Sequence, residues 1–309
     1  YTSHPALVFD KAKGSTIWDV NGEKYLDLCA GFGVHALGHN PDVFHSVWQD
    51  FLHSASPPIM HGMGDVYASR AKVEFISKLR SILPLPLDSI LLTLSGSQAV
   101  EAAMKTAMLK SNCSGFITFE GAYHGLDFGS LSITSRHDFW QPFSHWPAFR
   151  DNVIELDFSM PIEDLKPALQ SAKLELDRRG HGVAAVIVEP VQGRAGIRFN
   201  GMKWLHELSS VCKAQNILLI FHEVFTGLGR CGEMFFAHSV PCDILCCGKA
   251  LGGGLPLSAC ISRKEIMAAW PDNKGEAIFT GTFFGHPLAC LLGIHVINEI
   301  QGSVLGRPR

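Results

Sequence analysis

The sequence predicts an α/β protein with a mainly parallel central sheet flanked by helices. Short apolar runs alternate with longer amphipathic stretches, which is the pattern of buried parallel strands connected by helices. With 309 residues, 47% of them hydrophobic and 18% charged, the chain can bury a sizeable core. The apolar runs are Ile90–Leu94, Phe116–Phe119, Ala184–Val188, Ile217–Phe221, Ile244–Cys247 and Ser258–Ile261.

Two local elements precede these runs. Asn21-Gly22 favours a tight turn with positive φ angles, so a β-hairpin is expected over Ile17–Leu26. A glycine-bearing stretch at 31–38 follows, and a helix is expected from Pro41 to about His53. Later in the chain, helical spacing defines one apolar face, made of Ala99, Val100, Ala103, Met104, Ala107 and Met108. A last helical stretch is expected from Leu288 to Ile300.

Composition excludes several classes of protein. The net charge of −3 does not indicate a basic face for nucleic acid, and no apolar run is long enough for a membrane span. The nine cysteines are odd in number and scattered without a C-x-x-C pair, so we expect mostly buried, reduced thiols and a cytoplasmic protein. The fifteen histidines show no zinc-binding spacing, so no metal site is expected.

Polar or glycine-rich segments directly follow five of the predicted strands. Because ligands bind at the carboxyl ends of strands in parallel sheets, we expect these segments to form one site. The segments are Ser95–Ser97, Glu120–Gly125, Glu189–Gly193, His222–Gly227 and Gly248–Gly254.

Each segment has both a functional and a purely structural interpretation. The Ser95–Ser97 segment at a strand-to-helix junction suits a phosphate group, but serine also caps helices there. Lys249 follows an apolar strand, where its amine would deprotonate easily and form a Schiff base; the alternative is an ordinary surface lysine. Tyr123 can stack on a flat ring or simply pack in a loop.

The remaining candidates, Glu189, Gln192 and Thr282, carry weaker signals. Glu189 and Gln192 place a carboxylate and an amide at one strand end; the alternative is that they belong to a salt-bridged loop. Thr282 lies close to glycine and proline, where a turn or capping role is the default.

Taken in order, these motifs resemble the class III (ornithine/4-aminobutyrate type) aminotransferases, pyridoxal 5′-phosphate (PLP) enzymes of fold type I. The resemblance runs from about residue 9 to 300. It rests on eight segments: Asp19–Asp27, Gly31–His39, Ser95–Ala103, Gly121–Gly125, Val188–Gly193, Glu223–Arg230, Gly248–Gly254 and Thr282–Pro287.

The resemblance implies a role for each matching residue. Lys249 would hold the cofactor covalently and, once freed, move a proton between substrate and cofactor. Gly96 and Ser97 would bind its phosphate, Tyr123 would stack on its ring, and Gln192 would reach its phenolic oxygen. Thr282 would contact the cofactor phosphate of a neighbouring subunit, which implies a homodimer. The cofactor site would further include Ser95, His124, Val224 and Glu189, the last also sorting the two substrates.

The sequence departs from the family pattern at His222. The family has an aspartate there, which pairs with the pyridine nitrogen and keeps it protonated. A neutral histidine favours that protonation much less, and a histidinium opposes it. We therefore expect impaired or altered transamination.

A second departure concerns the end of the chain. The family continues into a small C-terminal domain that usually supplies an arginine for the substrate carboxylate, and we expect that domain to be missing here. The expected organisation is an N-terminal segment with the hairpin (1–45), a large PLP-binding domain (46–290) and the start of a connecting helix (291–309).

The resemblance implies transfer of an amino group from an amino acid, ω-amino acid or amine to a 2-oxo acid. Two alternatives stay open. One is a catalytically impaired or inactive, truncated relative, and the other is an aminomutase or decarboxylase on the same scaffold.

Overall fold

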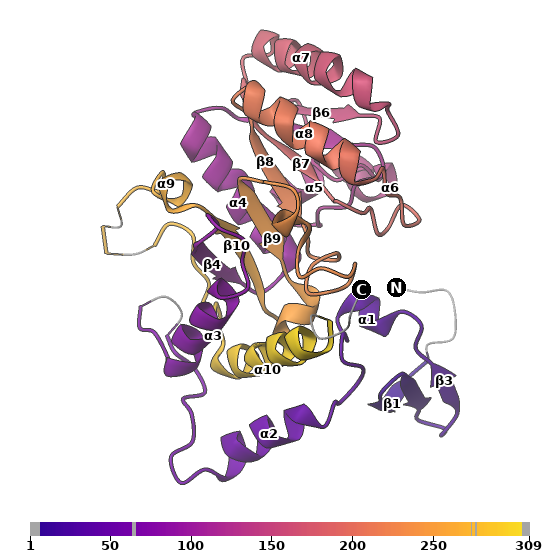
Figure 1. Cartoon of the computed structure of the whole chain (residues 1–309), viewed down its shortest axis with the longest axis vertical. Helices are drawn as coiled ribbons and strands as arrows, with labels where there is room; N and C mark the ends of the chain where they lie inside the picture. The colour runs from indigo at the N-terminus through magenta and orange to yellow at the C-terminus, as the bar shows by residue number, and fades with distance from the viewer. Residues whose placement is uncertain (1–6, 64–65, 273, 276, 305–309) are drawn as a thin grey trace.

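A computed structural model describes residues 7–63, 66–272, 274–275 and 277–304. Its central sheet has seven strands in the order β4-β10-β9-β8-β7-β5-β6 (Figure 1). β10 runs antiparallel to both of its neighbours, and the other neighbouring strands are parallel to one another, so the mainly parallel sheet is confirmed. The strands are β4 (Ser89–Thr93), β5 (Gly115–Phe119), β6 (Val153–Leu156), β7 (Val183–Val188), β8 (Leu218–His222), β9 (Ile244–Cys247) and β10 (Ser258–Ser262).

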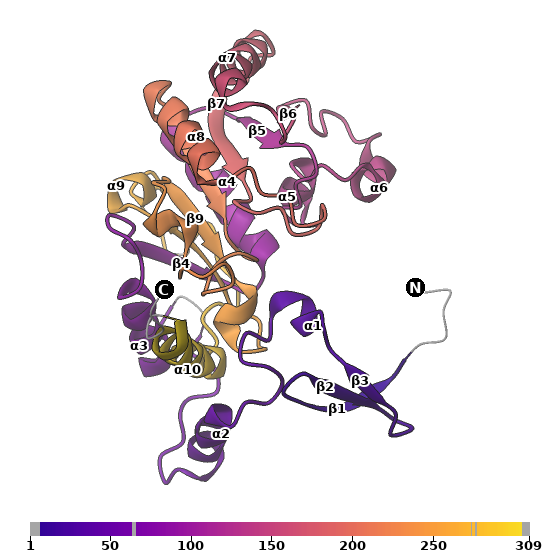
Figure 2. The same ribbon diagram turned by 45° about the vertical axis from the view of Figure 1, so that its right-hand side comes forward.

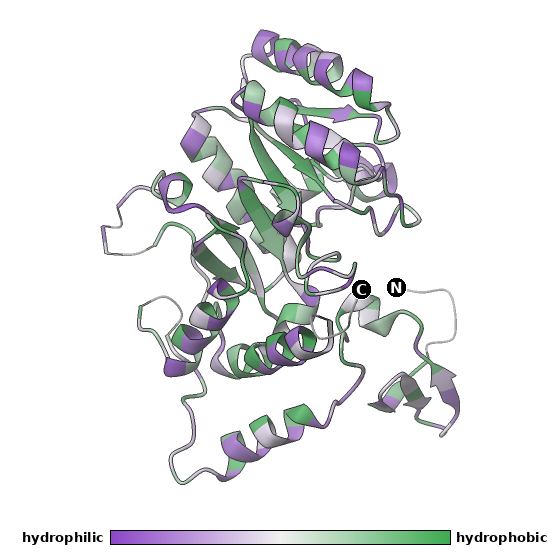
Figure 3. Ribbon diagram, viewed as in Figure 1, coloured by the Kyte–Doolittle hydropathy of each residue, from purple (hydrophilic) through white to green (hydrophobic). Residues whose placement is uncertain are grey.

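Helices cover both faces of this sheet. Because side chains alternate along a strand, Phe221 packs into the cluster that includes α7 (Ile162–Arg178) and α8 (Met202–Ala214). Its neighbour Ile220 packs on the opposite face against α4 (Gly96–Ser111). The central strands are consequently apolar along their whole length, as the hydropathy colouring shows (Figure 3).

Three helices pack beside the β4–β10 side of the sheet. α10 (Pro287–Val304) lies against α3 (Arg70–Arg80), and α2 (Val43–His53) contacts α10 (Figure 1). α2 and α10 fall where the sequence predicts helices.

A small separate sheet contains the predicted hairpin (Figure 2). β2 (Thr16–Asp19) pairs with β3 (Lys24–Leu26) in antiparallel register, and β1 (Phe9–Lys13) joins β2 on the other side. The buried Asp19 carboxylate accepts the backbone N–H groups of Asn21 and Glu23, both at 2.9 Å, which fixes the turn.

The remaining elements are short. They are α1 (Ala30–Gly33), α5 (Phe128–Ser132), α6 (His137–Trp140), α9 (Lys264–Met267) and the 3₁₀ turns η1 (Gln141–Phe143), η2 (Phe236–His238) and η3 (Lys249–Gly252). Among the described residues, no helix has both the length and the apolar character needed to cross a bilayer.

Two expectations need correction. Met108, assigned to the apolar face of α4, is 38% exposed, because it follows Ala107, the last buried residue of the helix. Five cysteines are buried as expected, but Cys29 and Cys231 are exposed, since both lie in loops outside the strands. All nine are free thiols.

Candidate active site

A cavity of about 670 Å³ opens at the carboxyl ends of β4, β5, β7, β8 and β9. The five predicted strand-end segments therefore do converge. Its lining comprises Leu28, Cys29, Phe32, Gly96, Ser97, Tyr123, His124, Gly125, Arg136, Glu189, Gly193, Arg194, His222, Val224, Phe225 and Lys249.

Lys249 carries the reactive amine of the cavity. It begins η3 directly after β9, with a φ of +48°, a left-handed conformation that few non-glycine residues adopt. Its Nζ lies 4.6 Å from the centre of the Phe225 ring. Burial lowers the pKa of this amine from 10.5 to about 8, although the Glu189 carboxylate opposes that shift. A larger fraction of Lys249 is therefore the neutral, nucleophilic amine near neutral pH.

One end of the cavity lies at the N-terminus of α4. The helix begins at Gly96. The backbone N–H groups of Gly96 and Ser97 lie in its first turn and therefore have no hydrogen-bond partner within the helix. A side chain at Gly96 would lie 2.8 Å from a Val224 methyl group, and one at Gly125 would lie 2.3 Å from Ser97 Oγ. The two glycines thus keep this end of the cavity open.

Apolar and aromatic side chains line the space between these two ends. Tyr123 follows β5 and Val224 follows β8, and both line the cavity. The guanidinium group of Arg194 lies 4.5 Å from the centre of the Tyr123 ring, which holds that ring at the wall by a cation–π contact.

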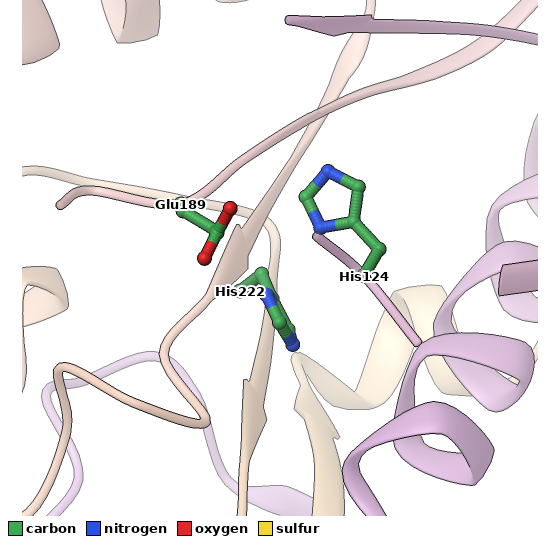
Figure 4. A group of neighbouring side chains, drawn as sticks. All are labelled: His124, Glu189 and His222. Atoms are coloured by element: carbon green, nitrogen blue, oxygen red, sulfur yellow. The ribbon is translucent and has the colours of Figure 1, made fainter. Parts of the chain in front are cut away.

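His124, Glu189 and His222 form a buried polar group on the same cavity wall (Figure 4). The Glu189 Oε2 atom accepts the Tyr123 N–H at 2.9 Å. Burial raises the pKa of this carboxyl group to about 7, whereas the Tyr123 and Gly193 N–H groups act in the opposite direction.

Both imidazoles of this group are neutral. Burial lowers the pKa of His124 to about 3. The pKa of His222 lies well below 6.5, mainly because the side chain is buried and to a smaller extent because of His124 and the Lys249 charge. The ring centres of the two histidines lie 5.0 Å apart in an edge-to-face arrangement.

Three predicted site residues do not line the cavity. Ser95 caps α4, its Oγ accepting the Gln98 N–H at 3.2 Å, as in the structural interpretation of this segment. Gln192 is buried beside the cavity, and its amide donates to the Glu120 carbonyl at 2.8 Å. Thr282 is exposed, and its carbonyl lies 2.7 Å from His61 Nε2.

Several residues of the lining were given no role from the sequence. Phe225 lies within the predicted segment His222–Gly227, and Arg194 directly follows the segment Glu189–Gly193, so extending that segment by one residue would have found it. Arg136 lies in a loop between α5 and α6 without any recognisable motif. Leu28, Cys29 and Phe32 come from the segment around α1, and only the fold brings them to the cavity.

The site combines a helix N-terminus, which suits a phosphate group, with a lysine whose pKa is lowered. A family model described as aminotransferase class-III matches residues 1–307. The acetylornithine aminotransferase of Methanopyrus kandleri is 37% identical over 282 residues, which cover 90% of this chain and 66% of that protein. The chain belongs to the class-III aminotransferases, whose cofactor is PLP.

Solved structures agree on the fold-type-I architecture. The (S)-enantioselective omega-transaminase of Thermomicrobium roseum superimposes with a TM-score of 0.84 at 25% identity, covering 98% of this chain and 73% of that one. A PLP-bound amine transaminase from an uncultivated Pseudomonas species gives a TM-score of 0.81 at 24% identity, covering 97% and 71%. The chain spans about two thirds of the length of the Methanopyrus protein.

The residues present fit PLP at most of its groups. The open helix N-terminus suits its phosphate, Lys249 suits its aldehyde, and Tyr123 and Val224 suit its ring. His222 is the exception, because a neutral imidazole supplies no negative charge for a protonated pyridine nitrogen.

Proposed function

We propose that the chain transfers an amino group from an amino acid, an ω-amino acid or an amine to a 2-oxo acid, with PLP as cofactor. The observation that carries this proposal is a lysine of lowered pKa in the same cavity as an open helix N-terminus. When bound, the cofactor supplies a carbonyl group that exchanges amino groups and a ring that withdraws electrons from the substrate carbon.

The proposed roles follow from where the side chains lie. The N–H groups of Gly96 and Ser97, with the Ser97 hydroxyl, bind the phosphate, and Tyr123 and Val224 hold the ring between them. Lys249 first anchors the cofactor through Nζ. Once the substrate has displaced it, the neutral amine of Lys249 would take the proton from the substrate carbon and deliver it to the carbon of the cofactor that came from its aldehyde group.

Glu189 is placed to influence this proton transfer. Its carboxyl group interacts with the Lys249 charge, and its raised pKa of about 7 lets it change ionisation near neutral pH. We assign to it the sorting of the two substrates, because a charged and an uncharged Glu189 attract different substrate groups. Arg136 and Arg194 at the cavity favour substrates that carry a carboxylate.

We further propose a homodimer in a cytoplasmic location. Thr282 is exposed and absent from the lining of the chain's own cavity, so it is available to a second copy's phosphate. Nine free cysteines suit a reducing compartment. Gln192 would contact the phenolic oxygen through its amide nitrogen, which has two N–H donors and uses one of them on the Glu120 carbonyl.

The proposed domain organisation places the functional residues in one part of the chain. Residues 46–290 form the PLP-binding domain, preceded by the segment 1–45 and followed by a connecting helix over 291–309. Residues 1–6, 64–65, 273, 276 and 305–309 of these ranges lie outside those that the structure describes.

The test is an absorbance spectrum of the purified protein with added PLP, before and after borohydride reduction. We expect a band near the visible edge that reduction fixes onto Lys249, located by peptide mapping, and no fixation in Lys249→Ala. Amino-group transfer is then measured with a panel of donors. A folded protein that shows neither band nor fixation would refute the proposal.

A further inference from the structure

Three metal-ligating side chains meet in the cavity although the sequence places them far apart. His124 lies in the loop after β5, Glu189 directly after β7, and His222 at the end of β8. Each offers one donor atom, and these atoms all lie within 4.8 Å of one another. Figure 4 shows nitrogen atoms of both imidazoles and the Glu189 carboxylate around a common space. The three residues are 0%, 4% and 6% exposed.

Two of the three side chains have an unsatisfied nitrogen atom. The Nδ1 atoms of His124 and His222 are buried and have no hydrogen-bond partner among the described residues. A neutral imidazole has one nitrogen with a free lone pair, and a carboxylate oxygen has more than one. Leaving the two imidazole nitrogens unpaired in a buried site is unfavourable, and a cation beside the Glu189 carboxylate would satisfy both.

Outer contacts already orient two of the three groups. His124 Nε2 lies 3.2 Å from Thr118 Oγ1; if this nitrogen carries the proton, the Nδ1 lone pair is left for a metal ion. The Glu189 carboxylate is oriented by the Tyr123 N–H, which donates to Oε2 at 2.9 Å, and by the Gly193 N–H. Carboxylate oxygens have further lone pairs that can bind a metal ion. Hydrogen bonds of this kind from the far side of a ligand are typical of metal sites.

We propose that His124, Glu189 and His222 bind one divalent transition-metal ion, with zinc preferred, when the cofactor is not bound. Two imidazoles and one carboxylate suit zinc or cobalt and disfavour magnesium and calcium, which take oxygen ligands. Zinc bonds of about 2.0–2.1 Å in a tetrahedral site place the ligand atoms roughly 3.4 Å apart. Donor atoms that lie up to 4.8 Å apart must therefore approach one another by up to about 1.4 Å when the ion binds. Water from the cavity would complete the coordination.

His222 is the residue that creates this donor set. The family's aspartate at that position would leave a single histidine in the group. Because the same three side chains line the proposed cofactor cavity, zinc and PLP should exclude each other. This exclusion, unlike the metal site itself, rests on the proposed function.

The experiment uses the whole chain freed of cofactor and of metal. Zn²⁺ binding is measured by calorimetry, and Co²⁺ serves as a probe whose visible spectrum reports the ligand geometry. The variants are His222→Leu and Glu189→Gln, each checked for folding by circular dichroism, so that one can carry the test if the other unfolds. The matched control is His39→Asn. His39 belongs to a second histidine–carboxylate cluster, in which the ring centres of His39 and His35 lie 3.9 Å apart and His39 Nε2 lies 2.8 Å from Asp27 Oδ2. This cluster is not part of the cavity lining.

We expect one Zn²⁺ per chain with micromolar or tighter affinity, unchanged in His39→Asn and weakened about a hundredfold or more in a folded site variant. Added PLP should release the ion. Absence of stoichiometric binding, or equal binding by the site variants, would overturn the metal site. Simultaneous binding of Zn²⁺ and PLP would overturn the exclusion alone. If the protein binds PLP but never binds Zn²⁺, the metal site is refuted and the proposed function stands. If it binds Zn²⁺ but never binds PLP, the metal site stands and the proposed function is refuted.

Discussion

Replacing His222 with aspartate should restore the protonated pyridine nitrogen that the wild-type site does not support. His222 is 6% exposed, and burial together with the Lys249 charge keeps its imidazole neutral. The wild-type site therefore places no negative charge at this position. A carboxylate about 4 Å from a pyridinium, at an effective dielectric constant of roughly 20, contributes about 4 kcal/mol. This corresponds to about 3 pKa units on the ring nitrogen, before the cost of burying the new carboxylate is subtracted.

The direct assay is nitrogen-15 NMR of PLP labelled at the ring nitrogen and bound to the protein. We expect an unprotonated nitrogen in the wild type and in His222→Asn, and a protonated one in His222→Asp. The asparagine variant matches aspartate in shape and lacks its charge, so it separates charge from size.

The rate of amino-group transfer should follow the protonation state. About 3 kcal/mol of recovered stabilisation would accelerate the proton-transfer step in His222→Asp on the order of a hundredfold. A protonated ring nitrogen in the wild type would refute the reasoning. So would equal rates in the aspartate and asparagine variants.

Three further predictions concern Lys249, Arg194 and helix α10. Capture of PLP by Lys249 should increase with pH and level off above about pH 8, because only the neutral amine reacts; its inflection is read from borohydride-fixed product, and an inflection near 10.5 would contradict the lowered pKa. In Arg194→Gln that inflection should move to higher pH, because the Arg194 charge helps to lower the Lys249 pKa. In the same variant, KM for carboxylate-bearing donors should increase about tenfold, while KM for plain amines stays unchanged. Gly293→Ala should lower the free energy of unfolding by about 1–3 kcal/mol, because the new Cβ would lie 2.6 Å from the Leu251 carbonyl oxygen. Gly302→Ala in the same helix meets no atom within 4 Å and should stabilise by up to about 1 kcal/mol, so equal shifts in thermal denaturation would contradict the packing argument.

The central strands were predictable because both of their faces are buried. A strand such as β7 is apolar at every position, and that continuous run is visible without any structure. β1 and β6 were not predicted. β1 is almost entirely exposed and contains charged residues, and β6 is a short edge strand of mixed polarity. Such strands form through backbone pairing with a neighbour, which leaves little trace in side-chain pattern.

The same distinction holds for the candidate site. Lys249, Ser97 and Tyr123 follow buried strands, so their meeting at one edge of the sheet follows from topology alone. The histidines lack the short spacings by which metal motifs are recognised in a sequence, so the sequence does not predict a metal site. His124 and His222 meet because β5, which precedes His124, and β8, which ends at His222, both end at the cavity.

The wall of the cavity has two structural origins, which affects how its specificity can change. Lys249 and the start of α4 follow strands of the central sheet, whereas Leu28, Cys29 and Phe32 belong to the segment around α1, next to the small N-terminal sheet. Phe32 is 80% exposed, so its replacement should leave the core intact. A combinatorial library over Leu28, Cys29 and Phe32 can therefore sample new donor preferences while the cofactor machinery is inherited unchanged, which makes this segment the natural starting point for engineering.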